Sequence, residues 1–310
     1  MSGVTDAPFR RLARRFGASL TVTEMVASDR LAAGDEEAFE RAACDADGGI
    51  YGVQLAGCQT NWLGEAARIA EGQGASFIDI NMGCPAKRVV GGYAGSALMR
   101  DLDLALTLIE SVIAAVSIPV SVKMRLGWDH ATLNAADLAH RAEAAGAVFV
   151  SVHGRTRCQF YTGTADWGAI APVKAAVAIP VFANGDIRSA AEAHTALKLS
   201  GGDGVLIGRS AVGRPWLLGE IAAALNGRTY TPPCVTERLD AARAQLSGSL
   251  DCYGPRKGLL NFRKHLAAYI GHEGVARDTI SALCRIDVPD ELDAAMRRAW
   301  PVAAALDRAA

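Results

Sequence analysis

The sequence predicts an α/β protein: a (β/α)8 TIM barrel entered after its first strand, followed by a small all-α helical domain. Short β-branched runs alternate with amphipathic helical stretches up to about residue 225, which is typical of parallel strands joined by crossover helices. The runs lack polar alternation, as expected for strands covered on both faces. Beyond residue 225 the strand-like runs disappear and helical patterns remain.

Seven strands are expected, whereas a TIM barrel needs eight. They are 20–25, 50–55, 77–81, 119–124, 147–152, 180–184 and 204–207, with helical patterns at 7–16, 61–72, 101–116, 132–145, 167–177, 189–199 and 212–225. The chain opens on the turn Ser2-Gly3-Val4-Thr5-Asp6, and Pro8 stands near the start of a helix, so the first strand is expected to be missing. An open doubly wound sheet is the competing architecture, but no glycine-rich dinucleotide loop follows an early strand.

The change of pattern near residue 225 predicts two domains. Asn226-Gly227 and Pro232-Pro233 have the composition of a linker. Helical patterns follow at 236–252, 255–271 and 291–309. We expect a barrel domain over residues 1–225 and a helical domain over residues 235–310, which is within the ordinary range of domain sizes.

Composition argues against several classes of protein. The formal net charge is −1, so no global basic field attracts nucleic acid. The seven cysteines form no CxxC pair and no cysteine–histidine metal spacing, which argues against a disulfide framework or a structural zinc. No apolar run is long enough for a bilayer and no signal-peptide pattern opens the chain. We therefore expect a cytoplasmic protein without membrane association or a metal, and infer no obligate protein partner.

Residues 77–85, Phe-Ile-Asp-Ile-Asn-Met-Gly-Cys-Pro, are the strongest candidate for chemistry. A buried strand ends at Asn81 and presents the thiol of Cys84, between a flexible Gly83 and a rigid Pro85. Reactive groups of parallel barrels gather at the carboxyl ends of strands. Because most unpaired cysteines are small buried hydrophobic residues, this segment alone supports core packing and a reactive thiol about equally.

Polar residues also end three other predicted strands, namely Gln54, Lys123 and His153. A lysine within a strand is costly to bury unless an anionic group meets it. The alternatives are that the Lys123 amine reaches solvent and that His153 is a hydrogen-bonded core residue. Three such residues at strand ends favour a ligand site.

The last two predicted strands end in Asn184-Gly185-Asp186 and Gly208-Arg209. Phosphate sites of TIM barrels commonly form after strands seven and eight. Glycine backbone can approach a phosphate closely, and an arginine can bind it bidentately. We favour a phosphate-bearing ligand over the alternative that these glycines only form tight turns.

Two long loops combine basic residues with glycines or aromatic rings. Residues 84–96 include Lys87 and Arg88, and residues 153–167 include Arg155, Arg157, Phe160, Tyr161 and Trp167. Arginines bind phosphates and rings stack on bases, so the second loop suits a nucleotide chain. The alternative is that the rings pack back onto the barrel, which we favour for Trp167.

Seven motifs, in order along the chain, resemble the tRNA-dihydrouridine synthases, with the bacterial B-type branch most similar. They are GVTDAPFR at 3–10, VQLAG at 53–57, NMGCPxxK at 81–88, SVKMRLGW at 121–128, VHGRTRxQxYxGxADW at 152–167, NGDI at 184–187 and IGRxxxGRPW at 207–216. The resemblance covers essentially the whole chain. In the family a strand ending in Ala-Pro-Met precedes the first motif, and Met1 stands where that methionine would be. We expect a flavin contact to be missing with that strand, and favour a mis-chosen start codon as the reason.

The resemblance implies an enzyme that uses FMN and NADPH to reduce the C5=C6 bond of specific uridines in tRNA. It implies that Cys84 protonates C5 while reduced flavin gives a hydride to C6. Gln54, Lys123 and His153 would line the flavin ring, and Asn184, Gly185, Asp186, Gly208 and Arg209 would contact its phosphate and ribityl chain. Asn81, Lys87, Arg88, Arg155 and Arg157 would face the tRNA, as would a helical-domain cluster of Arg256, Lys257, Arg263, Lys264 and His265. Two alternatives stay open: an FMN barrel that reduces a free pyrimidine or enone, and a tRNA-binding protein that has lost catalysis.

Overall fold

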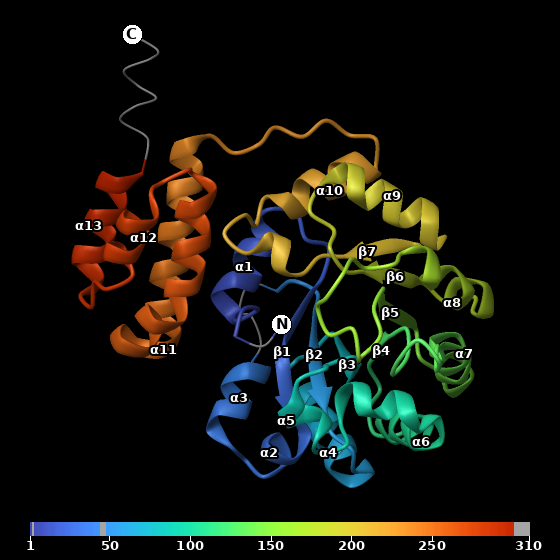
Figure 1. Ribbon diagram of the computed structural model, residues 1–310. Helices are drawn as coiled ribbons and strands as arrows, with labels where there is room; N and C mark the ends of the chain where they lie inside the picture. The colour runs from blue at the N-terminus through green and yellow to red at the C-terminus, as the bar shows by residue number, and fades with distance from the viewer. Residues whose placement is uncertain (2, 44–47, 301–310) are drawn as a thin grey trace. The chain divides into compact units, whose positions relative to one another are not determined.

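The computed structural model describes residues 1, 3–43 and 48–300, which fall into two compact units (Figure 1). The first unit contains Met1–Asp6 and Ser19–Gly208, and the second contains Ala7–Ala18 and the chain from Arg209 onward. These units are defined by contacts. The domain limits of 1–225 and 235–310 stay predictions, and the two divisions differ over residues 7–18 and 209–225.

The first unit is built on one sheet of seven parallel strands, in the spatial order β1-β2-β3-β4-β5-β6-β7 (Figure 1). The strands are β1 (Thr21–Ala27), β2 (Tyr51–Ala56), β3 (Phe77–Met82), β4 (Val120–Arg125), β5 (Phe149–His153), β6 (Val181–Asn184) and β7 (Gly204–Leu206). Each pair of neighbours is parallel. All seven predicted strands are confirmed, as is the α/β class with a TIM-barrel-like sheet.

The helices of this unit lie around the curled sheet (Figure 1). They are α2 (Ser28–Ala32), α3 (Glu36–Ala42), α4 (Thr60–Gly72), α5 (Lys87–Val90), α6 (Leu102–Ile113), α7 (Ala135–Ala145), α8 (Ala171–Ala176) and α9 (Ala190–Ser200), with 3-10 turns η1 (Gly95–Arg100) and η2 (Gly168–Ile170). The sequence prediction missed α2, α3 and α5, because helices of four to seven residues are too short to show a clear apolar period. Because the helices cover the sheet, every residue of β2 and β3 is buried.

An aromatic layer fills the barrel at the amino ends of the strands. The ring of Phe149 packs edge-on against Phe77 and Phe182, with centroids 5.4 and 5.2 Å apart. Gly52 and Gly204 leave the room for these rings, since a Cβ at Gly52 would lie 2.3 Å from Phe77 and one at Gly204 would lie 2.7 Å from Phe182. This closed end leaves the carboxyl ends of the strands as the place for a site.

The N-terminal turn contacts both β1 and the residues that follow β7. The N–H groups of Val4 and Thr5 donate to the Met1 carbonyl at 3.0 and 3.1 Å. The Gly3 N–H donates to the carboxylate of Glu24 on β1, and a Cβ at Gly208, just after β7, would lie 3.2 Å from the Met1 sulfur. The turn predicted from the sequence is therefore present, although its Ser2 lies outside the described residues.

The second unit is helical. It contains α1 (Ala7–Arg15), the 3-10 turn η3 (Arg209–Ala211), α10 (Leu217–Leu225), α11 (Val235–His272), α12 (Arg277–Leu283) and α13 (Pro289–Ala299). Helix α11 breaks at Gly254, which has φ 72° and is followed by Pro255, so the two predicted helices at 236–252 and 255–271 are confirmed. Helix α12 was not predicted, and residues 301–309 of the predicted last helix lie outside the described residues. No helix in the described part of the chain is both long and apolar enough to cross a membrane.

One histidine of the helical unit is packed as a neutral aromatic residue. His265 on α11 is 0% exposed, and its ring stacks on Phe9 of α1 at 5.3 Å. Neither ring nitrogen has a hydrogen-bond partner among the described residues. Burial, followed by the charge of Lys264, lowers the pKa of His265 to about 3. The sequence interpretation that placed His265 in an RNA-facing cluster is therefore wrong, because the side chain is inside the packed helices.

We expect the substitution His265→Phe to reduce the acid sensitivity of the protein. The folded-state pKa lies below the unfolded one, so the unfolded chain binds the proton more readily and stability is lost as the pH falls from about 6.5 toward 3. Between pH 6.5 and pH 4.5 this residue lowers the unfolding free energy by roughly 2 kcal/mol. Urea unfolding at the two pH values measures the difference, with the exposed His140→Phe as control. An equal pH dependence in His265→Phe and in the unsubstituted protein would contradict the expectation.

Candidate active site

The carboxyl ends of the central strands bring several predicted residues together. Asn81 on β3 and Lys123 on β4 are register partners, and Lys123 is in turn the partner of Ser151 on β5. Gln54 on β2 is the register partner of Asp79, two residues before Asn81. His153 is the last residue of β5 and pairs with Arg125 at the end of β4. The strand-end prediction for Gln54, Lys123 and His153 therefore agrees with the register of the sheet.

A chain of buried hydrogen bonds runs from Asp79 to the backbone of Cys84. The Asp79 carboxylate accepts from Gln54 Nε2 at 2.6 Å and from the Ser121 hydroxyl at 2.7 Å. Gln54 Oε1 accepts from Asn81 Nδ2 at 2.8 Å. Asn81 Oδ1 then accepts from the N–H of Gly83 at 3.1 Å and from that of Cys84 at 2.9 Å. Each amide is thus held with its nitrogen toward Asp79 and its oxygen toward Cys84.

Asp79 is a buried residue of this hydrogen-bond chain that the sequence did not lead us to expect there. It is 2% exposed, and burial raises its pKa, opposed by the hydrogen bonds from Gln54 and Ser121 and by the charge of Lys123. A carboxylate at this depth is costly unless hydrogen bonds and a cation meet it. The sequence did contain one signal for this residue. Asp79 is an acidic residue inside a predicted strand that is covered on both faces, where apolar residues are expected.

Cys84 is half-buried and held from both sides of the turn after β3. Its N–H is fixed by Asn81, and its carbonyl accepts from the hydroxyl and the N–H of Ser96 at 2.8 and 3.0 Å. Gly95 permits this closure, because it has φ 61° and a Cβ there would lie 2.8 Å from the Cys84 oxygen. The segment 84–96, expected as a loop, contains the short helix α5, on which Lys87 and Arg88 are exposed.

The Lys123 amine and the His153 imidazole lack a full set of hydrogen-bond partners among the described residues. Burial lowers the pKa of Lys123 to about 8, an effect that Asp79 partly offsets and Arg125 reinforces. Burial, and then the charges of Lys123, Arg125 and Arg155, lower the pKa of His153 to about 2, so its imidazole is neutral. His153 Nδ1 is buried without a hydrogen-bond partner in the described part of the structure. The rim therefore presents a cationic group and an unpartnered imidazole nitrogen to a ligand.

The predicted phosphate segment after β6 forms a tight turn against His153. Asn184 donates to the carbonyl of Leu206 at 2.7 Å, and Gly185 has φ 115°. A Cβ at Gly185 would lie 3.2 Å from His153 Nε2 and 2.7 Å from Ala165, so only glycine fits. Gly208 belongs to the first unit, whereas Arg209 belongs to the second. The predicted contact of Arg209 with a phosphate stays a prediction.

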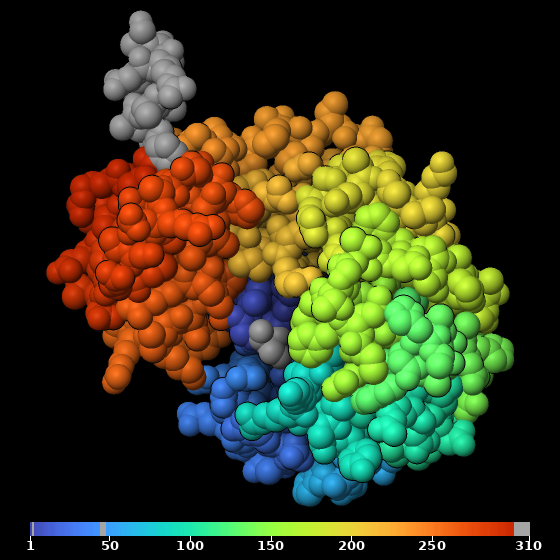
Figure 2. Space-filling model, in the orientation of Figure 1, coloured from blue at the N-terminus to red at the C-terminus, as the bar shows by residue number. Residues whose placement is uncertain are grey.

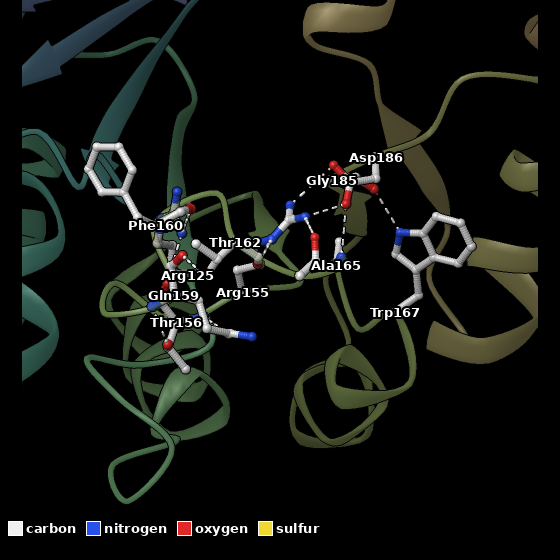
Figure 3. Close-up of polar contacts among 11 residues, drawn as sticks. Arg125, Arg155, Thr156, Gln159, Phe160, Thr162, Ala165, Trp167, Gly185 and Asp186 are labelled. Atoms are coloured by element: carbon white, nitrogen blue, oxygen red, sulfur yellow. Dashed lines mark hydrogen bonds and ion pairs between the residues drawn. The ribbon is translucent and has the colours of Figure 1, made fainter.

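Arg155 is committed to the interior rather than to a ligand (Figure 3). It is 2% exposed and holds Asp186 with two nitrogens, at 2.5 and 3.1 Å. Its remaining bonds go to the carbonyls of Thr162 at 3.1 Å and Gly163 at 2.7 Å. Burial opposes ionisation of Asp186, but the bonds from Arg155 and from the Ala165 N–H outweigh it and keep its pKa below the usual range. The expectation that Arg155 faces RNA is not supported, because its guanidinium group is bound to the carbonyls of the 153–167 loop and to Asp186. The Asp186 carboxylate is likewise bound to Arg155 and to the Ala165 N–H.

A second buried arginine, which the sequence analysis did not single out, joins two loops. Arg125 donates to the carbonyl of Gly83 at 2.9 Å, beside Cys84. It also donates to the carbonyls of Thr156 at 2.8 Å and Phe160 at 2.9 Å in the other loop (Figure 3). The turn that carries the thiol and the aromatic loop are thereby attached to one side chain.

Trp167 packs back onto the barrel, as favoured from the sequence. Its indole N–H donates to the carbonyl of Gly185 at 2.8 Å (Figure 3). Phe160 and Tyr161 behave differently: they are 43% and 48% exposed and contact each other edge-to-face at 4.8 Å. Among the described residues no group of three or more histidine, cysteine or acidic side chains is placed to hold a metal ion.

We expect Arg155→Lys to loosen the 153–167 loop. Lysine keeps the charge but cannot replace the four bonds made by the planar fork, and breaking a buried pair costs about 3–5 kcal/mol. Limited chymotrypsin digestion with mass spectrometry measures cleavage after Phe160 and Tyr161, which should become at least tenfold faster. Arg141→Lys, at a half-buried arginine paired with Asp103 and Asp137, is the control. Equal cleavage rates in all three proteins would show that the fork does not hold the loop.

The family model described as Dihydrouridine synthase (Dus) matches residues 1–298. A probable tRNA-dihydrouridine synthase of Rickettsia conorii is 50% identical over 271 residues, which cover 87% of this chain and 82% of the relative. tRNA-dihydrouridine synthase B of Xanthomonas axonopodis pv. citri is 43% identical over 291 residues, covering 94% and 88%. Among solved structures, morphinone reductase is similar in fold, with a TM-score of 0.50 at 13% identity over 76% of this chain and 85% of that one. The chain belongs to the dihydrouridine synthase family.

Proposed function

We propose that this protein is a tRNA-dihydrouridine synthase, which reduces the C5=C6 bond of uridine in tRNA with a bound FMN and NADPH as electron donor. The relatives that carry this name are similar over most of the chain. The observation that carries the proposal is the half-buried thiol of Cys84, fixed by Asn81 at the rim that also presents Lys123 and a neutral His153. Since the substrate is tRNA, the proposed location is the cytoplasm.

The residues at the rim fit a flavin. Gln54, Lys123 and His153 would contact the ring system: Lys123 supplies a cation to its pyrimidine edge, and His153 Nδ1 lacks any other partner among the described residues. The backbone around Asn184, Gly185, Asp186 and Gly208 would hold the ribityl phosphate. When bound, a reduced flavin supplies a hydride to C6 of the uridine.

Cys84 supplies the other half of the reaction. Addition of a hydride at C6 requires a proton at C5, and together they convert the double bond to a single bond. The Cys84 thiol is the proton donor, so it must keep its proton until the substrate is seated. Asn81 and Ser96 fix the backbone on both sides of the thiol, which positions the acid without assistance from the substrate.

The tRNA must deliver an extruded base, because a stacked uridine cannot present C6 to a flavin at the strand ends. Exposed cations on α5, Lys87 and Arg88, and the exposed rings of Phe160 and Tyr161 suit an RNA strand. The loop 153–167, lime green in Figure 2, lies at the surface in that view.

In the helical unit, the break in α11 forms a hollow lined by Tyr253, Pro255, Arg256, Lys257 and Leu260. Arg256, Lys257 and Lys264 are exposed, and they supply the positive charge that an RNA backbone requires. Arg263 differs, because it is paired with Asp287. We assign this unit to tRNA binding through the exposed members of the cluster.

We expect Cys84→Ala to abolish dihydrouridine formation while leaving reduction of the flavin by NADPH unchanged. The variant lacks the proton donor, so a loss of at least about 10²-fold in the rate of uridine reduction is expected. Mass spectrometry of an unmodified tRNA transcript measures the product, and flavin absorbance measures the reductive half-reaction. The exposed Cys158→Ala is the control, expected to behave as the unsubstituted enzyme. Full dihydrouridine formation by Cys84→Ala would remove the assigned role, and turnover of free uracil without tRNA would favour a small-molecule reductase.

The rate of uridine reduction should fall above about pH 8. Burial lowers the pKa of Lys123 to about 8, so its charge is present below that pH and lost above it. One titrating group gives a decline of about tenfold per pH unit. Lys123→Arg keeps the charge at alkaline pH, so the decline should then begin at a higher pH even if the maximal rate is lower. Single-turnover rates between pH 6 and pH 10 measure this, and an unchanged alkaline limb in Lys123→Arg would assign the limb to another group.

A further inference from the structure

Two arginines lie against one tryptophan at the edge of the site. The guanidinium carbon of Arg157 is 4.6 Å from the centre of the Trp128 ring, and that of Arg100 is 4.9 Å from it. Arg100 ends the 3-10 turn η1 after β3, Trp128 follows β4, and Arg157 follows β5. The three residues therefore come from the carboxyl-terminal loops of three adjacent strands, the same end of the barrel as Cys84.

Backbone hydrogen bonds hold Trp128 and Arg157 beside each other. The Arg157 N–H donates to the Gly127 carbonyl at 3.0 Å, and the Cys158 N–H donates to the Trp128 carbonyl at 2.9 Å. Gly127 also allows the following loop to turn back closely, since a Cβ there would lie 1.9 Å from the carbonyl oxygen of Thr132. The ring and the Arg157 backbone are thus positioned before anything binds.

The charge of this cluster is not balanced within the described structure. Neither Arg100 nor Arg157 forms an ion pair with a described residue, and Arg157 Nε is buried without an acceptor. The neighbouring acids are occupied: Asp101 caps α6 by accepting from the Leu104 N–H at 3.0 Å, and Asp129 accepts from the Thr132 hydroxyl at 2.8 Å. The two cations on one ring and the unmet Arg157 Nε donor suit an anionic ligand.

We propose that Arg100, Trp128 and Arg157 form a binding site for a backbone phosphate of the RNA substrate. The inference rests on the proposed function and adds Arg100 and Trp128 to the residues that recognise RNA. The ring orients the guanidinium groups by stacking, which leaves their N–H edges for phosphate oxygens. RNA is favoured over the phosphates of a dinucleotide because Phe160 and Tyr161, in the same loop as Arg157, expose rings to which neighbouring bases can stack.

The test is binding of an unmodified tRNA transcript to the flavin-loaded enzyme, measured by fluorescence anisotropy at several salt concentrations. Arg100→Gln and Arg157→Gln should each weaken binding by about tenfold and reduce the salt slope by about one, because each removes one phosphate contact. Arg157→Lys and Trp128→Leu should weaken binding while retaining both charges. Arg68→Gln, at an exposed arginine paired with Glu65 on α4, is the matched control and should bind as the unsubstituted enzyme.

The outcomes separate this site from the proposed function. If the unsubstituted enzyme binds and reduces tRNA but Arg100→Gln leaves the affinity and the salt slope unchanged, the phosphate site is overturned and the function stands. Arg100 is exposed, so this variant remains informative even if Trp128→Leu fails to fold. A rise in the KM for NADPH with unchanged tRNA affinity would assign the cluster to the dinucleotide and also overturn the inference. An unsubstituted enzyme that does not bind tRNA would overturn the proposed function first.

Discussion

The carboxylate of Asp79 sets the direction of the hydrogen bonds on which the site depends. It lies inside the barrel and accepts from Gln54 and Ser121, so Gln54 must turn its oxygen toward Asn81, and Asn81 must turn its oxygen toward the backbone of Cys84. With the carboxylate replaced by an amide, both side chains could reverse, and the turn after β3 would lose its acceptor. A group buried below the rim thus determines how the thiol above it is presented.

Two arginines of this chain are buried and hold loops, so they are not available to an RNA ligand. Arg125 and Arg155 satisfy backbone carbonyls of the long loops, a task for which several fixed donors on one plane are suited. The arginines left for a ligand are those whose guanidinium groups stack on a ring or reach solvent. Within one sequence motif, burial therefore separates the arginines that hold a loop from the arginines that can face the substrate.

The strands were predictable because the apolar runs that a doubly covered parallel sheet requires are also visible in one dimension. The rim positions of Gln54, Lys123 and His153 followed from the same rule, since parallel strands end at a common edge. The inward direction of Arg155 was not predictable: its neighbours in sequence are polar, and its partner Asp186 lies 31 residues away. Likewise His265, directly after two basic residues in sequence, faces Phe9 of a helix more than 250 positions earlier, and only the packing reveals that it is buried.

The position of Arg125 has a consequence for how variants of this protein combine. Because one guanidinium group holds both the carbonyl beside Cys84 and two carbonyls of the aromatic loop, the free energies of the two loops are not independent. A substitution that shifts the backbone at Phe160 also changes what the turn at Gly83 can gain from Arg125. Double-mutant cycles across these loops will therefore be non-additive although the loops belong to different strands, and the shared side chain is the term that couples them.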